Sequence, residues 1–206
     1  MGFSNLMTNL YFIRHAHTTL NGKRLFQGGQ TNSELDEVGQ QQLSDARVGM
    51  QASLPDNYLL VCSPLIRTKE TAKGLHLKNN NLIFDERIKE IGFGTWEGRS
   101  LEDVKREFPE DVDRYYKNDP LMIPQNGESI QSVADRMVEA INYYAKSEYE
   151  NVVFVSHGNS ISIGLSALLL EGAPFRRILA IPNNVSLSKV VMDDQISLKY
   201  YSRIFK

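Results

Sequence analysis

Three short runs of consecutive apolar residues stand out along the chain. They occupy residues 10–13, 58–62 and 152–155, and each is rich in β-branched or aromatic side chains. Strands that are buried on both faces have this continuous apolar pattern, whereas half-exposed strands alternate apolar and polar residues. The three runs therefore predict central strands of a parallel sheet.

Apolar residues recur at helical spacing after the first run and before the third run. The first set is Leu43, Ala46, Met50 and Leu54, and the second is Ile130, Val133, Met137 and Ile141. Asp36 and Ser129 precede these sets and are suited to cap the two helices. Strands and helices thus alternate, which predicts an α/β fold: a three-layer sandwich with a mostly parallel central sheet.

The strand pattern disappears between residues 91 and 126. Ser100 is placed to cap a helix that contains Val104 and Phe108, and three prolines follow at 109, 120 and 124. This pattern predicts a helical, cap-like insertion at about residues 95–128. Near the end of the sequence, residues 185–192 and 196–201 flank Asp193-Asp194-Gln195, which is typical of an antiparallel hairpin.

Composition narrows the possible classes of protein. A chain of 206 residues is expected to form one domain, here 1–206. Its 23 basic and 25 acidic side chains give a net charge of −2, which argues against a dedicated nucleic-acid or membrane surface. The chain has no general positive field, so an anionic ligand such as phosphate would have to be bound by a few basic side chains gathered in one cleft.

Several features favour a cytoplasmic location. Cys62 is the only cysteine and lies in an apolar run, so it is expected to be a buried thiol. No apolar stretch approaches the roughly 20 residues that span a bilayer. Residues 1–9 also lack the charged and apolar regions of a secretory signal.

Polar residues follow each of the three predicted strands. Arg14-His15 comes after the first, Ser63-Pro64 with Arg67 after the second, and Ser156-His157-Gly158 after the third. Ligands of open α/β sheets bind at the carboxyl ends of the strands, so these side chains are expected to converge. Any one of them alone could merely cap or bridge, but three occurrences in order favour a site.

In this order the motifs resemble those of the histidine phosphatase superfamily, in its phosphoglycerate mutase-like branch. The matching segments are Arg14-His15-Ala16-His17-Thr18-x-x-Asn21, Ser63-Pro64-Leu65-x-Arg67-Thr68, Glu90-x-x-Phe93-Gly94-x-Trp96-Glu97-Gly98 and Ser156-His157-Gly158-Asn159. The resemblance covers about residues 10–191. It implies a mostly parallel sheet between helices, with a helical excursion after Glu90.

The resemblance also implies roles in phosphoryl transfer. His15 is expected to be the nucleophile that forms a phosphohistidine, and Glu90 the acid and then the base. Phosphate binding is expected from Arg14, Arg67, His157 and Asn21, and further substrate contacts from His17, Gln27, Gly28 and Gly158. His17 replaces the Glu or Gln of many relatives, and it could either face the pocket or make a structural contact.

The preferred interpretation is a phosphatase that acts on a small phosphorylated metabolite without metal or cofactor. A mutase reaction stays open, although the mutases usually carry a longer insertion after the glutamate. A non-catalytic phosphate-binding regulator is disfavoured because both His15 and Glu90 are present. A zinc site of His15, His17 and His157 is disfavoured because neighbouring arginines repel a cation. The sequence does not indicate the oligomeric state.

Overall fold

The computed structural model describes residues 7–78, 80–170 and 173–206. Within these residues, six strands form one sheet in the order β3-β2-β4-β1-β5-β6. Strands β1 (Thr8–Arg14), β2 (Leu59–Cys62), β3 (Leu82–Phe84) and β4 (Asn151–Ser156) are parallel, and β5 (Leu187–Met192) and β6 (Ile196–Arg203) pair antiparallel. The three predicted central strands and the predicted hairpin are confirmed.

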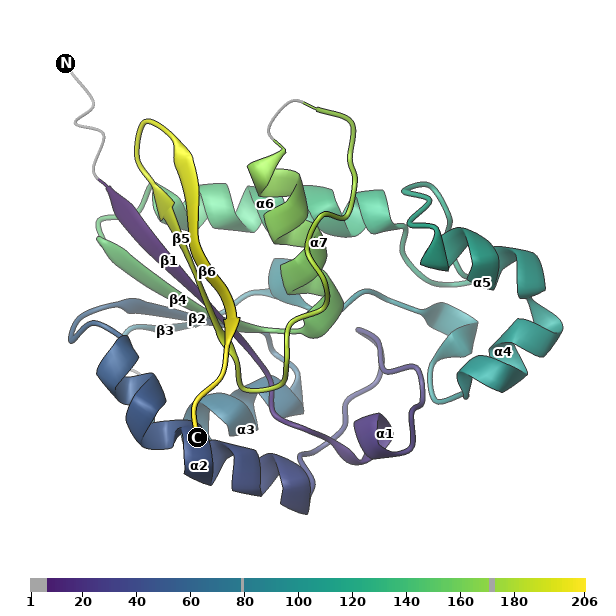
Figure 1. Cartoon of the computed structure of the whole chain (residues 1–206), viewed down its shortest axis with the longest axis horizontal. Coiled ribbons are helices and arrows are strands. Elements are labelled where there is room, and N and C mark those ends of the chain that lie inside the picture. Colours follow the sequence, from purple (N-terminus) through teal and green to yellow (C-terminus); the bar gives the residue numbers. More distant parts are fainter. Residues whose placement is uncertain (1–6, 79, 171–172) are drawn as a thin grey trace.

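Helices cover both faces of the sheet (Figure 1). Leu10 and Phe12 of β1 pack in one apolar cluster with α6 (Ile130–Ala145) and α7 (Gly158–Leu169). Tyr11 and Ile13 point to the other face, where they pack with α2 (Glu37–Ser53) and α3 (Ile66–Gly74). Because successive strand residues face opposite sides, one continuous apolar run serves two cores. The three-layer α/β sandwich is therefore confirmed.

Three predicted helix caps are present. The backbone N–H of Gly39 donates to Asp36 at 3.0 Å, and that of Ser132 donates to Ser129 at 3.0 Å. Ser100 accepts from the N–H of Asp103 at 3.1 Å and starts α4 (Leu101–Glu107). Each cap satisfies a backbone donor that has no partner inside the helix. Local sequence therefore determines where these helices begin.

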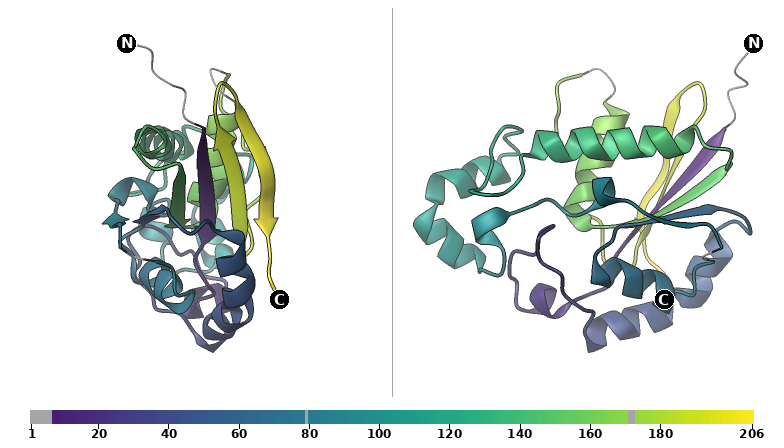
Figure 2. Two further views of the ribbon diagram at one scale, coloured as in Figure 1. Left: turned by 90° about the vertical axis from the view of Figure 1, so that its left-hand side faces the viewer. Right: turned by 180° about the vertical axis from the view of Figure 1, so that it is seen from behind.

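The segment between Glu90 and α6 is helical and lies at the end of the molecule opposite the C-terminus (Figures 1 and 2). It contains the 3₁₀ turn η2 (Gly94–Trp96), α4 and α5 (Pro109–Tyr116). An aromatic cluster anchors it: the ring of Phe93 lies 5.0 Å from Phe26 and 5.4 Å from Tyr115. This packing brings Tyr115 towards the carboxyl ends of the central strands.

Two further elements complete the described part of the chain: α1 (Thr19–Gly22) and the 3₁₀ turn η1 (Glu86–Ile88). The apolar pattern did not predict β3. Its Leu82, Ile83 and Phe84 are all exposed, and the run is only three residues long. Pairing with the end of β2, rather than burial, makes this segment a strand.

Candidate active site

The carboxyl ends of the parallel strands β1, β2 and β4 lie side by side at one end of the sheet. Arg14 lies opposite Ser156, and Cys62 lies opposite Val155, so the residues that follow each strand are neighbours. A cavity of about 410 Å³ opens at this end. The expected site residues that line it are Arg14, His15, Asn21, Gln27, Glu90 and Gly158.

The imidazole of His15 is buried at the end of β1. Its Nδ1 lies 2.7 Å from the carbonyl oxygen of Ala16, so this nitrogen carries the proton and Nε2 keeps its lone pair. Burial and the charges of Arg67 and Arg14 lower the pKa of His15 well below its usual value. The ring is therefore neutral near neutral pH and can act as a nucleophile through Nε2.

His157 and Arg67 lie side by side behind His15. The ring of His157 is 5.2 Å from that of His15, and its Nδ1 accepts from Nε of Arg67 at 3.1 Å. Nε2 of His157 is 2.8 Å from Oγ of Ser63. Burial and the charge of Arg67 lower the pKa of His157 well below its usual value. His157 is thus a neutral ring with both nitrogens engaged.

Arg67 makes three hydrogen bonds within the protein. Besides His157, it donates to the carbonyl oxygens of Thr31 at 2.7 Å and Gly28 at 3.1 Å. Burial lowers the pKa of Arg67 to about 10. Neither Arg67, His157 nor Gly28 lines the cavity, and a Cβ on Gly28 would come within 2.7 Å of the carbonyl oxygen of Ile91. Position 28 therefore has no room for a side chain, and the carbonyl oxygen of Gly28 helps to orient Arg67.

Arg14 faces the cavity with part of its guanidinium unused. Its Nη1 donates to the carbonyl oxygen of Pro182 at 2.6 Å, while its buried Nε has no partner within the described residues. Gly158 makes room for this group, because a Cβ there would lie 3.1 Å from Nε of Arg14 and 2.7 Å from Ile181. The N-terminus of α7 begins at Gly158, and the N–H groups of its first turn hold an anion, the carboxylate of Glu90.

Glu90 reaches the cavity from the coil after η1. Its carboxylate accepts from the backbone N–H groups of Asn159 at 3.2 Å and Ser160 at 3.0 Å, and from Oγ of Ser160 at 3.1 Å. These donors belong to the first turn of α7. They hold the carboxylate in the same cavity as His15.

The remaining expected residues belong to the segment after β1. The side-chain oxygen of Asn21 accepts from Thr18 as part of the α1 cap, and that of Gln27 also accepts from Thr18. The His17 ring lies 2.8 Å from Asp36 and does not line the cavity. Of the two interpretations of His17, the geometry favours the structural one.

Tyr115 and Arg177 are among the cavity residues that were not expected from the sequence. Tyr115 comes from α5, and its hydroxyl donates to the side chain of Asn159 at 2.9 Å. Arg177 comes from the loop after α7, and its Nε and Nη2 are buried without a partner in the described part of the chain. Neither residue lies in a periodic pattern, so no local signal marks it.

The three-histidine arrangement that a zinc site requires is not formed, because His17 turns to Asp36. Over residues 7–78, 80–170 and 173–206, no group of three or more His, Cys, Asp or Glu side chains could hold a metal ion. Among the described helices, none combines the length and apolar character needed to cross a membrane.

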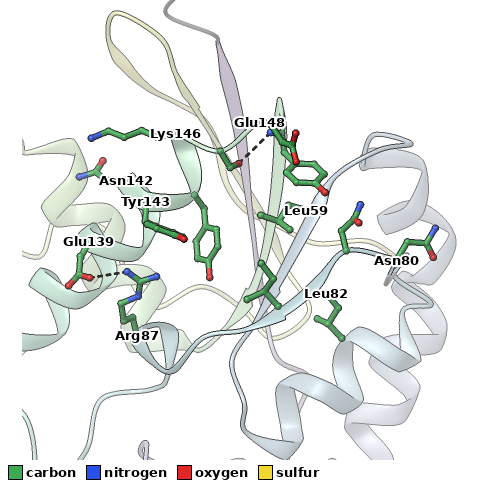
Figure 3. Close-up of a pocket in the computed structure, with 14 residues that line it drawn as sticks. Leu59, Asn80, Leu82, Arg87, Glu139, Asn142, Tyr143, Lys146 and Glu148 are labelled. Atoms are coloured by element: carbon green, nitrogen blue, oxygen red, sulfur yellow. Dashed lines mark hydrogen bonds and ion pairs between the residues drawn. The ribbon is translucent and has the colours of Figure 1, made fainter. Parts of the chain in front are cut away.

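A larger cavity, of about 980 Å³, lies near the amino-terminal ends of β2 and β3 (Figure 3). Its lining includes Leu59 and Leu82, which are the first residues of β2 and β3. Arg87 points into it and is paired with Glu139 at 2.9 Å. Its described lining contains no histidine or cysteine, whereas the smaller cavity is lined by His15 together with Glu90 and Arg14.

The fold is an α/β sandwich whose cavity brings a buried, neutral histidine together with a carboxylate and two arginines. A family model described as "Histidine phosphatase superfamily (branch 1)" matches residues 10–199. The chain is 32% identical to phosphoserine phosphatase 1 from Hydrogenobacter thermophilus over 153 residues, which are 73% of this chain and 71% of that protein. It is 30% identical to the probable phosphoglycerate mutase GpmB of Escherichia coli, over 93% of this chain and 88% of that protein.

A solved structure, mycobacterial glucosyl-3-phosphoglycerate phosphatase in complex with VO3, superposes with a TM-score of 0.82. It is 26% identical and covers 95% of this chain and 99% of its own. This chain therefore belongs to the histidine phosphatase superfamily, and the phosphoglycerate mutase-like fold inferred from the motifs is confirmed.

Proposed function

We propose that the protein hydrolyses a small phosphomonoester through a phosphohistidine on His15. The observation that carries this proposal is the state of His15, whose ring is buried and neutral and whose Nδ1–H donates to the carbonyl oxygen of Ala16. The lone pair of Nε2 is therefore free to attack phosphorus. Glu90 lines the same cavity and supplies a carboxyl group for proton transfer.

In the first half-reaction, Nε2 of His15 attacks phosphorus and the bond to the leaving oxygen breaks. Protonated Glu90 gives its proton to that oxygen, so the product leaves as an alcohol. In the second half-reaction, ionised Glu90 takes a proton from water as the water oxygen attacks phosphorus. The N–P bond breaks, its electron pair returns to Nε2, and phosphate is released.

Several groups stabilise the phosphoryl oxygens in this proposal. The unpartnered Nε of Arg14 and the positive end of α7 lie at the cavity, and Asn21 lines its wall. Arg67 does not line the cavity, but its positive charge acts on the site through its closeness to His15. Direct binding by His157 requires it to exchange its bond to Ser63 for one to a phosphoryl oxygen.

Hydrolysis is favoured over a mutase reaction by the relatives. Two of the three similar proteins named above are phosphatases, and the third is a probable mutase. A cavity of about 410 Å³ suits a small metabolite. Both reactions use the same phosphohistidine, and they differ in whether water or a second hydroxyl group accepts the phosphoryl group.

Release of phosphate from p-nitrophenyl phosphate, with and without a chelator, tests this proposal. Wild-type activity is expected to survive chelation, to vanish in His15→Ala and to fall about 100-fold or more in Glu90→Gln. His76→Asn is the matched control, because His76 is exposed and has a positive φ of 50°, which Asn tolerates. Its activity is expected to equal that of wild type.

Two outcomes contradict the proposal. Loss of activity on chelation shows that a metal ion takes part. A wild-type protein that binds phosphate but releases none from any phosphomonoester is a strict mutase or a non-catalytic binding protein, and transfer to a hydroxylated acceptor separates these two.

A further inference from the structure

Four buried side-chain polar atoms have no hydrogen-bond partner within the described residues. They are Nε of Arg14, Oγ1 of Thr95, and Nε and Nη2 of Arg177. Both arginines line the cavity that contains His15 and Glu90. Buried charged donors are costly when they are left unpaired. The transferred phosphoryl group accounts for Arg14, but nothing in the proposed reaction accounts for Arg177.

The loop that carries Arg177 is fixed by the helix beside it. In Figure 1 this loop runs back along α7, and its backbone is tied to two serines of that helix. The N–H groups of Ile178 and Leu179 donate to Ser166 at 3.1 and 3.2 Å, and Ser162 donates to the carbonyl oxygen of Leu179 at 2.6 Å. The position of Arg177 at the cavity is therefore built into the fold.

No described protein carboxylate in the cavity neutralises Arg177. Among the described residues that line it, Glu90 is the only acidic one, and the donors of α7 already hold Glu90. Burial raises the pKa of neighbouring Tyr115, an effect that the charge of Arg177 opposes, and the phenol donates its proton to Asn159. Tyr115 is therefore neutral, and the cavity keeps a second positive charge.

We infer that Arg177 is a specificity-determining residue that binds a carboxylate on the same phosphomonoester whose phosphoryl group reacts at His15. Nε and Nη2 lie on one edge of the guanidinium and form a fork that matches two carboxylate oxygens. Arg14 and Arg177 line one cavity of about 410 Å³, so both anionic groups belong to one small molecule. The substrate class is a phosphorylated carboxylic acid, and this inference rests on the proposed function.

The inference is tested with two substrates that differ at one carbon. 3-Phosphoglycerate carries a carboxylate where glycerol 3-phosphate carries a neutral hydroxymethyl group. Both are compared in wild type, in Arg177→Gln and in Arg176→Gln. Arg176 is the matched control, because it is the adjacent arginine of the same loop, is exposed and does not line the cavity.

Wild type is expected to prefer 3-phosphoglycerate, and Arg177→Gln to lower kcat/KM for this substrate about 10- to 100-fold. The same variant is expected to lower kcat/KM for glycerol 3-phosphate and p-nitrophenyl phosphate only about twofold, because these substrates lose no charged partner. Arg176→Gln is expected to leave all three unchanged. Glycerol 1,3-bisphosphate, which carries a phosphoryloxymethyl group in place of the carboxylate, is a further substrate.

Equal effects of Arg177→Gln on 3-phosphoglycerate and glycerol 3-phosphate overturn the inference. A dependence on Arg177 for the bisphosphate but not for 3-phosphoglycerate overturns the assignment of a carboxylate. Both results leave the proposed function intact, because p-nitrophenyl phosphate is still hydrolysed. Wild-type protein that is inactive on every one of these esters contradicts the proposed function instead.

Discussion

The proton on Nδ1 of His15 is held by a carbonyl oxygen from the next residue in the chain, Ala16. The motif that contains His15 identified the residue, but it did not indicate which ring nitrogen carries the proton. That choice depends on the backbone conformation at the end of β1. Likewise, the charge of Arg67 reaches His15 from a helix more than 50 residues away, and only the fold shows how close the two lie.

Glu90 has a bracing residue of its own, which the sequence did not reveal. Arg136 of α6 donates to the carbonyl oxygens of Lys89 at 2.7 Å and Glu90 at 3.2 Å, and it pairs with Glu128 at 3.0 Å. Arg136 does not line the cavity, so it acts through Glu90 as a positioning residue. An arginine on an otherwise ordinary helix face gives no local signal of this role.

Substitution of Arg136 by Gln is expected to lower kcat about 10-fold, because the Glu90 carboxyl group loses its fixed position. The loss is expected to be larger for alkyl phosphates, whose leaving oxygen needs a proton, than for p-nitrophenyl phosphate. A comparison of the two substrates measures this difference. Glu139→Gln is the control, because it removes an ion pair to Arg87 from the same helix but no bond to Glu90. Equal losses on both substrates contradict the positioning role.

At the scale of secondary structure, the elements that were predicted are those with a local cause. Continuous apolar runs indicated β1, β2 and β4, and caps indicated α2, α4 and α6. Strand β3 was missed because it is exposed and short, and its pairing partner lies more than 20 residues earlier. Its existence depends on a long-range contact that no local pattern encodes.

The same distinction applies to the site. Residues that directly follow a predicted strand, such as His15 and His157, could be assigned because strand ends converge. Tyr115 and Arg177 lie on α5 and on the loop after α7, and they reach the cavity only through the path of the whole chain. The interpretation of residues 95–128 as a cap within a single domain stays a prediction. It agrees with the position of Tyr115, which belongs to this segment and lines the cavity.

At the scale of the whole molecule, the site imposes a dependence of stability on pH. Burial and neighbouring arginines lower the pKa of both His15 and His157 below the usual value of 6.5. Below about pH 6.5 the unfolded chain takes up protons at these positions, whereas the folded protein does not. Acid therefore favours unfolding, and the stability present above pH 6.5 is lost as the pH falls towards the lowered pKa values.

The free energy of unfolding is accordingly expected to fall between pH 6.5 and pH 5, by up to about 1.4 kcal/mol per pH unit for each of the two histidines. Chemical denaturation at several pH values measures this slope. His15→Gln is expected to remove about half of it, and the exposed control His76→Asn none. A free energy that stays constant over this interval contradicts the burial of two neutral histidines.

The central claim, that His15 carries the phosphoryl group, is tested most directly by trapping the phosphoenzyme. In Glu90→Gln, p-nitrophenyl phosphate can still phosphorylate His15 because its leaving group needs no proton, but water lacks a base in the second step. Mass spectrometry after rapid alkaline quenching is expected to find one added phosphoryl group, labile to acid, on the peptide that contains His15. A burst of nitrophenol without that modification, or with it on another residue, contradicts the account.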